Sequence, residues 1–414
     1  MKNLVVLGAG TAGTMVVNKL RRRLPHGQWR ITVVEREDWH VYQPGLLLVP
    51  FGAAVSRKPV LSLIDGEVQL VLGEIDRVDT SAQTVTLDDG RFLPYDQLVI
   101  ATGVHPRPDQ TPGMLGPHWR TSIFDFYSLG GAEALSHALR DFAGGKLVVH
   151  ISEMPIKCPV APLEFSFLAD DEFRRRGIRH KVELTYVTPL SDAFTKPVAA
   201  LRLARMLEER GISLEPDFVV ECVKDKTLIS YDGREIAFDL LVTVPVNMGA
   251  QFVARSGLGN ELNCVPVDRY TFLATGYDNI FALGDAADLP TSKAGSVAHF
   301  AAEVFVENFL DHVAGRPMKR RFDGHANCFI ESGHGRALLI DFDYDNEPMP
   351  GRVGPLPLLR ESVVNHWGKL AFRWLYWNVL LPGRRMPMPR RRDRWPSKSI
   401  PHGPSRSPRN SPNR

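Results

Sequence analysis

Two cysteines separated by 170 residues are the side chains of this chain best suited to redox chemistry. Cys158 lies in IKCPVAPLEF and Cys328 lies in HANCFIESGHG. A thiolate is a strong nucleophile, and two thiols that meet in a fold can exchange electrons through a disulfide. Cys158 stands between a charged loop and the expected start of a helix, where backbone amides lower the pKa of a thiol. We therefore expect Cys158 to be reactive, and Cys222 and Cys264 to be buried, inert thiols.

The N-terminal segment predicts the fold that positions these cysteines. A buried strand at residues 3–8 runs into the turn G-A-G-T-A-G, a helix follows, and the next strand ends at Glu35. The glycines of such a turn let a pyrophosphate approach the backbone, the helix N-terminus binds the phosphates, and the acid accepts hydrogen bonds from a ribose. We expect dinucleotide contacts from the turn and from the residues after the second strand: Gly8, Gly10, Thr11, Ala12, Gly13, Glu35 and Arg36.

A second α/β unit at residues 111–240 lacks the corresponding glycine turn. Its first strand, KLVVHIS, continues into EMPIKCPV, with no glycine between His150 and Cys158. A turn without glycine cannot bring its backbone as close to a phosphate, and Glu153 would repel one. NAD(P)H is therefore not the expected electron donor.

Two later segments indicate which dinucleotide binds. LVIATG and IFALGDAAD each read as a strand that ends in a glycine turn, and both resemble turns of the flavoproteins with two dinucleotide-binding domains. In that family both turns contact FAD, and the helix after the second turn points its N-terminus at the flavin. The resemblance implies FAD contacts from Ala101, Thr102, Gly103, Gly284, Asp285 and Lys293.

A narrower resemblance comes from CPVAPLEF, ANCF with a later GRALLIDF, the loop HVYQPGLLLV and an aromatic C-terminal helix. Together these segments resemble sulfide:quinone oxidoreductases. In that family sulfide opens a disulfide beside the flavin, a persulfide forms on one cysteine, and two electrons pass to FAD and then to quinone. The resemblance implies a redox pair of Cys158 and Cys328, FAD contacts from Gln43, Pro44 and Ile75, and a quinone ring between Phe329 and Phe372.

Two details of that resemblance stay open at the level of sequence. Glu164 is a catalytic candidate as a proton relay, although a solvated acid on a helix explains it equally well. Some branches of the family carry a third cysteine before the second domain, and the matching stretch HWRTSIFDFYSLGG has none. We therefore expect noncovalent FAD.

Composition and charge limit the location of the protein. A chain of 414 residues that is 44% hydrophobic can bury two domain cores, and four cysteines do not make a secreted disulfide framework. We see no signal peptide and no run of the roughly 20 apolar residues that a spanning helix needs. Residues 361–383 combine tryptophans with Lys369 and Arg373, which suits a helix lying in a lipid headgroup layer. We therefore expect a peripheral membrane protein on the cytoplasmic face.

The C-terminal tail is strongly basic. Residues 384–414 contain ten Lys or Arg and one Asp, so their net charge is 10 − 1 = +9 within a chain of +3. Such a tail is expected to be disordered and is either simply solvated or attracted to anionic lipid. Nothing indicates nucleic-acid binding, and His299, His334 and His366 lack metal-ligand spacing.

The expected fold class is α/β, with two Rossmann-like domains of the glutathione-reductase kind and a C-terminal segment that caps the flavin and meets the membrane. The expected units are 1–110 with 241–320 for FAD, 111–240 for the second domain, 321–383 for the cap, and 384–414 for the tail. The expected activity is sulfide oxidation coupled to membrane quinone. Alternatives are a type II NADH:quinone dehydrogenase, a flavocytochrome c-type sulfide dehydrogenase and a flavin redox sensor without turnover. The sulfur acceptor, the quinone type and homo-oligomerisation stay open.

Overall fold

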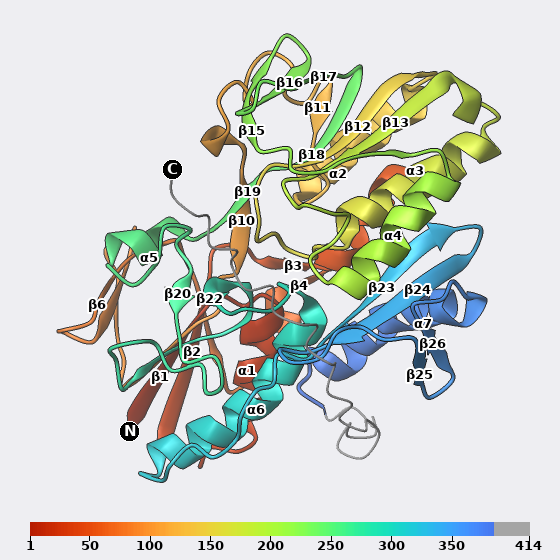
Figure 1. Cartoon of the computed structure of the whole chain (residues 1–414). Coiled ribbons are helices and arrows are strands. Elements are labelled where there is room, and N and C mark those ends of the chain that lie inside the picture. The colour runs from red at the N-terminus through yellow and green to blue at the C-terminus, as the bar shows by residue number, and fades with distance from the viewer. Residues whose placement is uncertain (385–414) are drawn as a thin grey trace, which may run out of the picture. The chain divides into compact units, whose positions relative to one another are not determined.

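The first domain is built on a parallel sheet of five strands in the order β21-β9-β1-β2-β5 (Figure 1). Its strands are β1 (Lys2–Leu7), β2 (Trp29–Glu35), β5 (Gln69–Leu72), β9 (Gln97–Ile100) and β21 (Ile280–Ala282). Their Val, Leu and Ile side chains are buried, as is usual for parallel strands covered on both faces. Helices α1 (Thr11–Arg21) and α6 (Gly295–Val313) pack against each other beside this sheet.

The second domain repeats this arrangement with a sheet in the order β11-β18-β12-β13-β14. The central strand β12 (Gly145–Ile151) pairs in parallel with β13 (Val182–Val187) on one side and with β18 (Leu240–Val244) on the other. β11 (Ile123–Phe124) and β14 (Ser213–Glu215) form the edges, and the helices are α2 (Leu129–Asp141), α3 (Ala161–Arg175) and α4 (Pro197–Glu209). The predicted boundary at residue 240 thus falls at the start of a strand that belongs to the second sheet.

The chain passes between the two domains along an antiparallel pair, β10 (Val104–Arg107) and β19 (Val246–Gly249) (Figure 1). Each domain also carries a three-stranded antiparallel sheet. In the first domain it consists of β6 (Ile75–Asp79), β7 (Thr84–Leu87) and β8 (Phe92–Pro94), and in the second of β15 (Val220–Lys224), β16 (Thr227–Ser230) and β17 (Glu235–Ala237).

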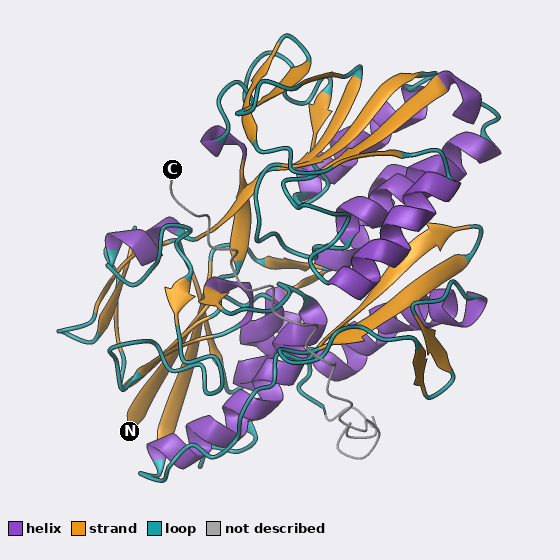
Figure 2. Ribbon diagram, in the orientation of Figure 1, coloured by secondary structure: helices purple, strands orange, loops and turns teal. Residues whose placement is uncertain are grey.

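The C-terminal segment forms a hairpin and a helix. Strands β23 (Ala326–Gly333) and β24 (Arg336–Phe342) form the hairpin, which lies between α3 and α7 (Val363–Leu375) (Figure 2). A small second hairpin, β25 (Gly351–Val353) with β26 (Leu356–Leu358), precedes α7. The helix predicted over 361–383 consists of two parts. The Ser362 side chain caps the start of α7, and a short π-helix, Tyr376–Leu380, follows the end of α7.

The computed structural model describes residues 1–384. The basic tail predicted to be disordered therefore lies outside the described residues, apart from Arg384. The remaining short elements are β3 (Trp39–Val41), β4 (Arg57–Pro59), β20 (Val265–Pro266), β22 (Ala287–Asp288), α5 (Gln251–Arg255) and 3₁₀ turns at Gln43–Phe51, Val60–Ser62, Pro108–Gln110, Arg179–Lys181 and Gly284–Ala286.

Candidate active site

One cavity of about 710 Å³ is bordered by the first domain, the second domain and the C-terminal segment. All the candidate site residues predicted from the sequence line this cavity, with the exception of Gly13. The structure thus brings together segments that are up to 364 residues apart, from Gly8 to Phe372.

The glycine turn leaves space for a ligand at one glycine and is closely packed at two others. A Cβ on Gly13 would lie 1.8 Å from the Gly8 carbonyl oxygen, and one on Gly8 would lie 2.6 Å from the Ala101 oxygen. Gly8 also has a φ of +96°, which glycine adopts without strain. A Cβ on Gly10 would meet no atom within 4 Å. Gly13 therefore serves helix packing, whereas Gly10 borders open cavity.

The start of α1 has the features of an anion site. No side chain caps the helix at Gly10, so the amides of its first turn keep their binding capacity beside the cavity. Glu35 Oε2 accepts a hydrogen bond of 2.7 Å from the Ala9 amide, which holds the carboxylate at the edge of the turn. An uncapped helix end, an open glycine and an acid after the second strand together fit a dinucleotide.

A second group of polar residues surrounds the middle of the cavity. Lys293 Nζ donates to the carbonyl oxygens of Asp285 (2.6 Å) and Ala287 (3.2 Å). Burial raises the pKa of Asp285, while the ammonium groups of Lys293 and Lys157 lower it. Lys157 Nζ donates to Gln43 Oε1 at 3.2 Å and has no ion-pair partner among residues 1–384. The sequence motifs did not indicate Lys157, although it immediately precedes Cys158.

Cys158 lies at the end of the turn between β12 and α3, with its backbone in the left-handed region. Its φ is +45°, and its amide donates to the Lys293 carbonyl oxygen at 2.7 Å. The Cys158 carbonyl accepts from the Ala161 amide (2.8 Å) and from the Tyr127 hydroxyl (3.2 Å). These bonds fix a strained residue, and they hold its thiol on the cavity wall.

The amides at the helix start lower the pKa of Cys158 as predicted, but the expected low net pKa is contradicted, because burial raises it by more. Burial raises the pKa of this thiol, and the opposing effects of the Lys369 ammonium and of the Ala161 and Val160 amides are smaller. The helix begins three residues later, at Ala161, so the amide effect is weaker than the sequence suggested. The fold therefore disfavours the Cys158 thiolate, and the Lys369 ammonium is the charge that opposes this effect.

Cys328 reaches the same cavity from β23. Its side chain is buried, and burial raises the pKa of this thiol well above its ordinary value. A negative charge on Cys158 raises it further, so the two sulfurs are close enough to interact electrostatically. Both are free thiols in this structure. The other two cysteines do not line the cavity: Cys264 is buried as predicted, but Cys222 is only half-buried on the small sheet of the second domain.

Glu164 is not a solvated helix acid. It is 1% exposed and forms an ion pair with Lys369, which reaches it from α7. Burial lowers the pKa of Lys369 to about 7, although a Cys158 thiolate would raise it. The sequence did not single out Lys369 as a site residue. Its spacing of three from Phe372, which places both side chains on the same face of the helix, was the available signal.

Phe329 and Phe372 border the end of the cavity nearest α7, and both are half-buried. Gly368 lets the Phe329 ring pack closely against α7, since a Cβ at Gly368 would lie 3.0 Å from that ring. The opposite face of α7 is exposed and apolar. It consists of Val363, Val364, Trp367, Leu370 and Trp374.

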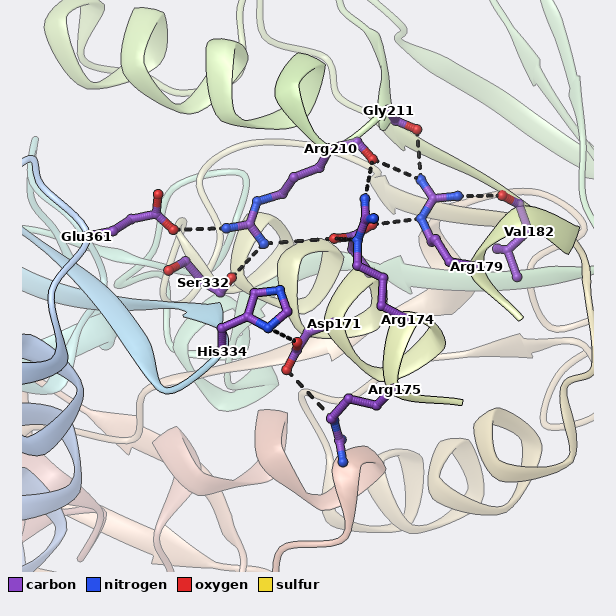
Figure 3. Close-up of polar contacts among 11 residues, drawn as sticks. Asp171, Arg174, Arg175, Arg179, Val182, Arg210, Gly211, Ser332, His334 and Glu361 are labelled. Carbon is purple, nitrogen blue, oxygen red and sulfur yellow. Dashed lines mark hydrogen bonds and ion pairs between the residues drawn. The ribbon is translucent and has the colours of Figure 1, made fainter. Parts of the chain in front are cut away.

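An arginine cluster fastens the hairpin to the second domain (Figure 3). Asp170 on α3 is 1% exposed and forms ion pairs with Arg174, Arg179 and Arg210. Arg210 also donates to the Ser332 carbonyl oxygen of β23 at 2.6 Å and pairs with Glu361 just before α7. α3 and β23 are thereby joined, which fixes the strand that carries Cys328 against the helix that follows Cys158.

Two classes of feature are missing from residues 1–384. No cluster of three His, Cys, Asp or Glu in this part could hold a metal ion. Within the same residues, no helix is both long and apolar enough to cross a membrane.

Known proteins are similar to this chain in sequence and in fold. The family model of the pyridine nucleotide-disulphide oxidoreductases matches residues 2–303. Mitochondrial sulfide:quinone oxidoreductase of Mus musculus is 28% identical over 393 residues, which cover 92% of this chain and 86% of that protein. The ferredoxin–NAD(+) reductase component of the p-cumate 2,3-dioxygenase system of Pseudomonas putida is 31% identical over 304 residues, 70% of this chain and 69% of that protein.

A solved structure agrees with these sequence similarities. The X-ray structure of the sulfide:quinone oxidoreductase from the hyperthermophilic bacterium Aquifex aeolicus matches with a TM-score of 0.78 at 21% identity, covering 93% of this chain and 92% of that chain. The expected fold class and the resemblance noted from the sequence are both confirmed. The chain belongs to the pyridine nucleotide-disulphide oxidoreductase family.

Proposed function

We propose that this protein oxidises sulfide, or a related small sulfur compound, with FAD and passes the electrons to quinone at a membrane surface. The observation that carries this proposal is the cavity in which Cys158 and Cys328 face the same space as the glycine turn. The similarity to sulfide:quinone oxidoreductases over more than 90% of the chain supports it.

The residues around the cavity fit FAD. The glycine turn and the uncapped start of α1 would hold the pyrophosphate, Glu35 the ribose, and the turn at Asp285 the ribityl chain. When bound, FAD would accept two electrons from sulfur and deliver them to quinone. The only cysteines on the cavity wall among residues 1–384 are the proposed redox pair, which supports noncovalent binding.

The two cysteines would do the sulfur chemistry. In an oxidised form their sulfurs would be joined as a disulfide. Hydrosulfide would attack one sulfur, leaving a persulfide on that cysteine and a thiolate on the other. An acceptor nucleophile would then remove the outer sulfur, and the two thiolates would re-form the disulfide by giving up two electrons, which bound FAD would supply the chemistry to accept. The Lys369 ammonium would stabilise the Cys158 thiolate, since the two charges attract each other in the cavity.

Quinone reduction also needs protons. Lys369 lies on the cavity wall beside Phe372, and a pKa of about 7 lets it give up a proton near neutral pH. Glu164 would hold that ammonium in place. It would also relay the proton that reprotonates Lys369 afterwards. Phe329 and Phe372 would then bracket the quinone ring.

The exposed face of α7 supports contact with a membrane surface, which we place on the cytoplasmic side. Trp367 and Trp374 are 64% and 63% exposed, and tryptophan is favoured where lipid meets water. Replacing both by serine should lower sedimentation with anionic liposomes. The matched control is Phe92→Ser on β8, which removes another exposed aromatic ring and should leave sedimentation unchanged.

An anaerobic titration tests the activity. Sulfide added to the FAD-bound protein should bleach the flavin absorbance, and ubiquinone should then restore it. NADH added instead should leave the flavin oxidised, because the turn at residues 152–160 contains no glycine.

The same titration separates the alternatives. Rapid bleaching by micromolar NADH would favour a type II NADH:quinone dehydrogenase. Bleaching by sulfide that only a cytochrome reverses would favour a flavocytochrome c-type sulfide dehydrogenase, and slow bleaching without turnover would favour a redox sensor.

A further inference from the structure

The phenol of Tyr376 lies behind the glycine turn, although the two are 365 residues apart. Tyr376 is 1% exposed and begins the π-helix after α7. Its hydroxyl oxygen is 2.8 Å from Thr11 Oγ1 and 2.6 Å from His40 Nε2. His40 Nδ1 is in turn 3.0 Å from the Ala9 carbonyl oxygen. One side chain from the end of the chain is thus connected to both sides of the turn.

The direction of each hydrogen bond follows from the chemistry of the groups. A carbonyl oxygen can only accept, so His40 Nδ1 carries a proton and donates to Ala9. Burial lowers the pKa of His40, so its imidazole is neutral and Nε2 is an acceptor. Tyr376 therefore donates to His40, and its oxygen accepts from the Thr11 hydroxyl. Every member of this network has one defined role.

Packing holds the phenol in this position. The Tyr376 ring meets the Tyr42 ring edge-on at 4.9 Å between centroids, and Trp377 Nε1 donates to Ser56 Oγ at 3.1 Å. Asn18 of α1 donates to the Leu381 carbonyl oxygen at 2.7 Å. Residues 376–381 are therefore fastened to the first domain at several points, and we call them the C-terminal anchor.

Tyr376 does not itself line the cavity, whereas Thr11, His40 and Ala9 do. Any effect of its hydroxyl on a ligand must therefore pass through the turn. We infer that Tyr376 is a positioning residue that holds the glycine turn in its FAD-binding form, so that the C-terminal anchor is part of the cofactor site. This inference rests on the proposed binding of FAD and adds a residue to it.

The test is FAD affinity, measured by titrating apoprotein with FAD. Tyr376→Phe keeps the ring and removes only the hydroxyl, which leaves Thr11 and His40 without their shared partner. We expect the Kd for FAD to rise about tenfold, the usual effect of losing one or two neutral hydrogen bonds. Tyr344→Phe is the matched control, because it removes a hydroxyl that bonds the Arg269 carbonyl oxygen away from the cavity. Its Kd should be that of the unaltered protein.

ADP serves as a second probe, since it carries the pyrophosphate but no flavin. Tyr376→Phe should weaken ADP and FAD by the same factor, because the turn contacts the part that they share. If Tyr376→Phe changes the Kd of FAD and the Kd of ADP by twofold or less, as Tyr344→Phe does, the inference is overturned. Weakening of FAD alone would also overturn it, since the effect would then arise at the flavin end.

A double-mutant cycle guards against a general loss of folding. His40→Asn should weaken FAD binding as well, and the double variant His40→Asn/Tyr376→Phe should be little worse than either single variant. Additive losses would mean that the two residues act separately and would contradict the network. If unaltered apoprotein binds no FAD, the proposed function fails instead, which is a distinguishable result.

Discussion

The two Rossmann-like domains have matching sheets but different first turns. Three residues, 8–10, join β1 to α1, whereas nine residues, 152–160, join β12 to α3. The short turn presents backbone and an open space at Gly10, and the long one presents the side chains of Lys157 and Cys158. Both turns border the same cavity.

This difference shows how one scaffold can serve two chemistries. A turn of glycines offers amides, which suit a phosphate that is bound and retained. A longer turn without glycine offers a thiol and an ammonium, which suit a reaction with a small sulfur anion. Under the proposed function, the second domain has exchanged a nucleotide site for a reactive residue that it delivers to the cofactor of the first domain.

The largest expected effect comes from removing the sulfur chemistry. Cys158→Ser and Cys328→Ser should each retain FAD and lower sulfide-driven quinone reduction by about a thousandfold or more, because a serine hydroxyl forms no disulfide and is not ionised. Anaerobic stopped-flow measurement of flavin bleaching checks this. The control is Cys222→Ser, whose half-buried thiol lies outside the cavity and should matter less than twofold. Activity retained in Cys158→Ser or Cys328→Ser would contradict the proposal that the second turn supplies one cysteine of a redox pair.

The next effect concerns the first turn. Gly10→Val places a side chain in the space beside the helix start, and the Kd of FAD should rise by about a hundredfold or more. Glu153→Val makes a comparable change in the exposed part of the second turn and should leave FAD affinity unchanged. Equilibrium titration of both apoproteins gives the two values. Equal losses would mean that the turns do not differ as proposed.

A third effect is expected from the ion pair between Glu164 of the second domain and Lys369 of α7. Lys369 is protonated below its pKa of about 7 and neutral above it, so quinone reduction should fall as the pH rises through this value. Lys369→Met should lower the rate by roughly a hundredfold at pH 6, as expected for loss of a general acid. Lys369→Arg keeps the charge at every pH and should abolish the inflection. An unchanged pH profile in the arginine variant would assign the titration to another group.

Local patterns predicted residues that line the cavity where these residues are neighbours in the sequence. The glycine turn, the turns at Gly103 and Asp285, and the position of Cys158 follow from short stretches of sequence in which backbone and side chain act together. The segment of Cys328 was found only through resemblance to a family, because nothing near it indicates what it faces.

The missed features depend on contacts between distant elements. Glu164 could not be distinguished from a surface acid until α7 placed Lys369 against it. The pKa of Cys158 was mispredicted because burial, which depends on the whole fold, exceeds the local effect of the helix. The pairing of β18 with β12, rather than composition, decides the sheet to which β18 belongs.

The order of the chain also sets the order in which the site can be made. β21 and α6 complete the first domain only after the entire second domain has been synthesised, and Cys328 follows later still. At a synthesis rate of about 5–20 residues per second, Cys158 emerges roughly 10–30 s before its proposed partner. During that interval β23 is absent and cannot cover α3. A nascent chain therefore carries this thiol for a time without its proposed partner and without the hairpin that packs on α3.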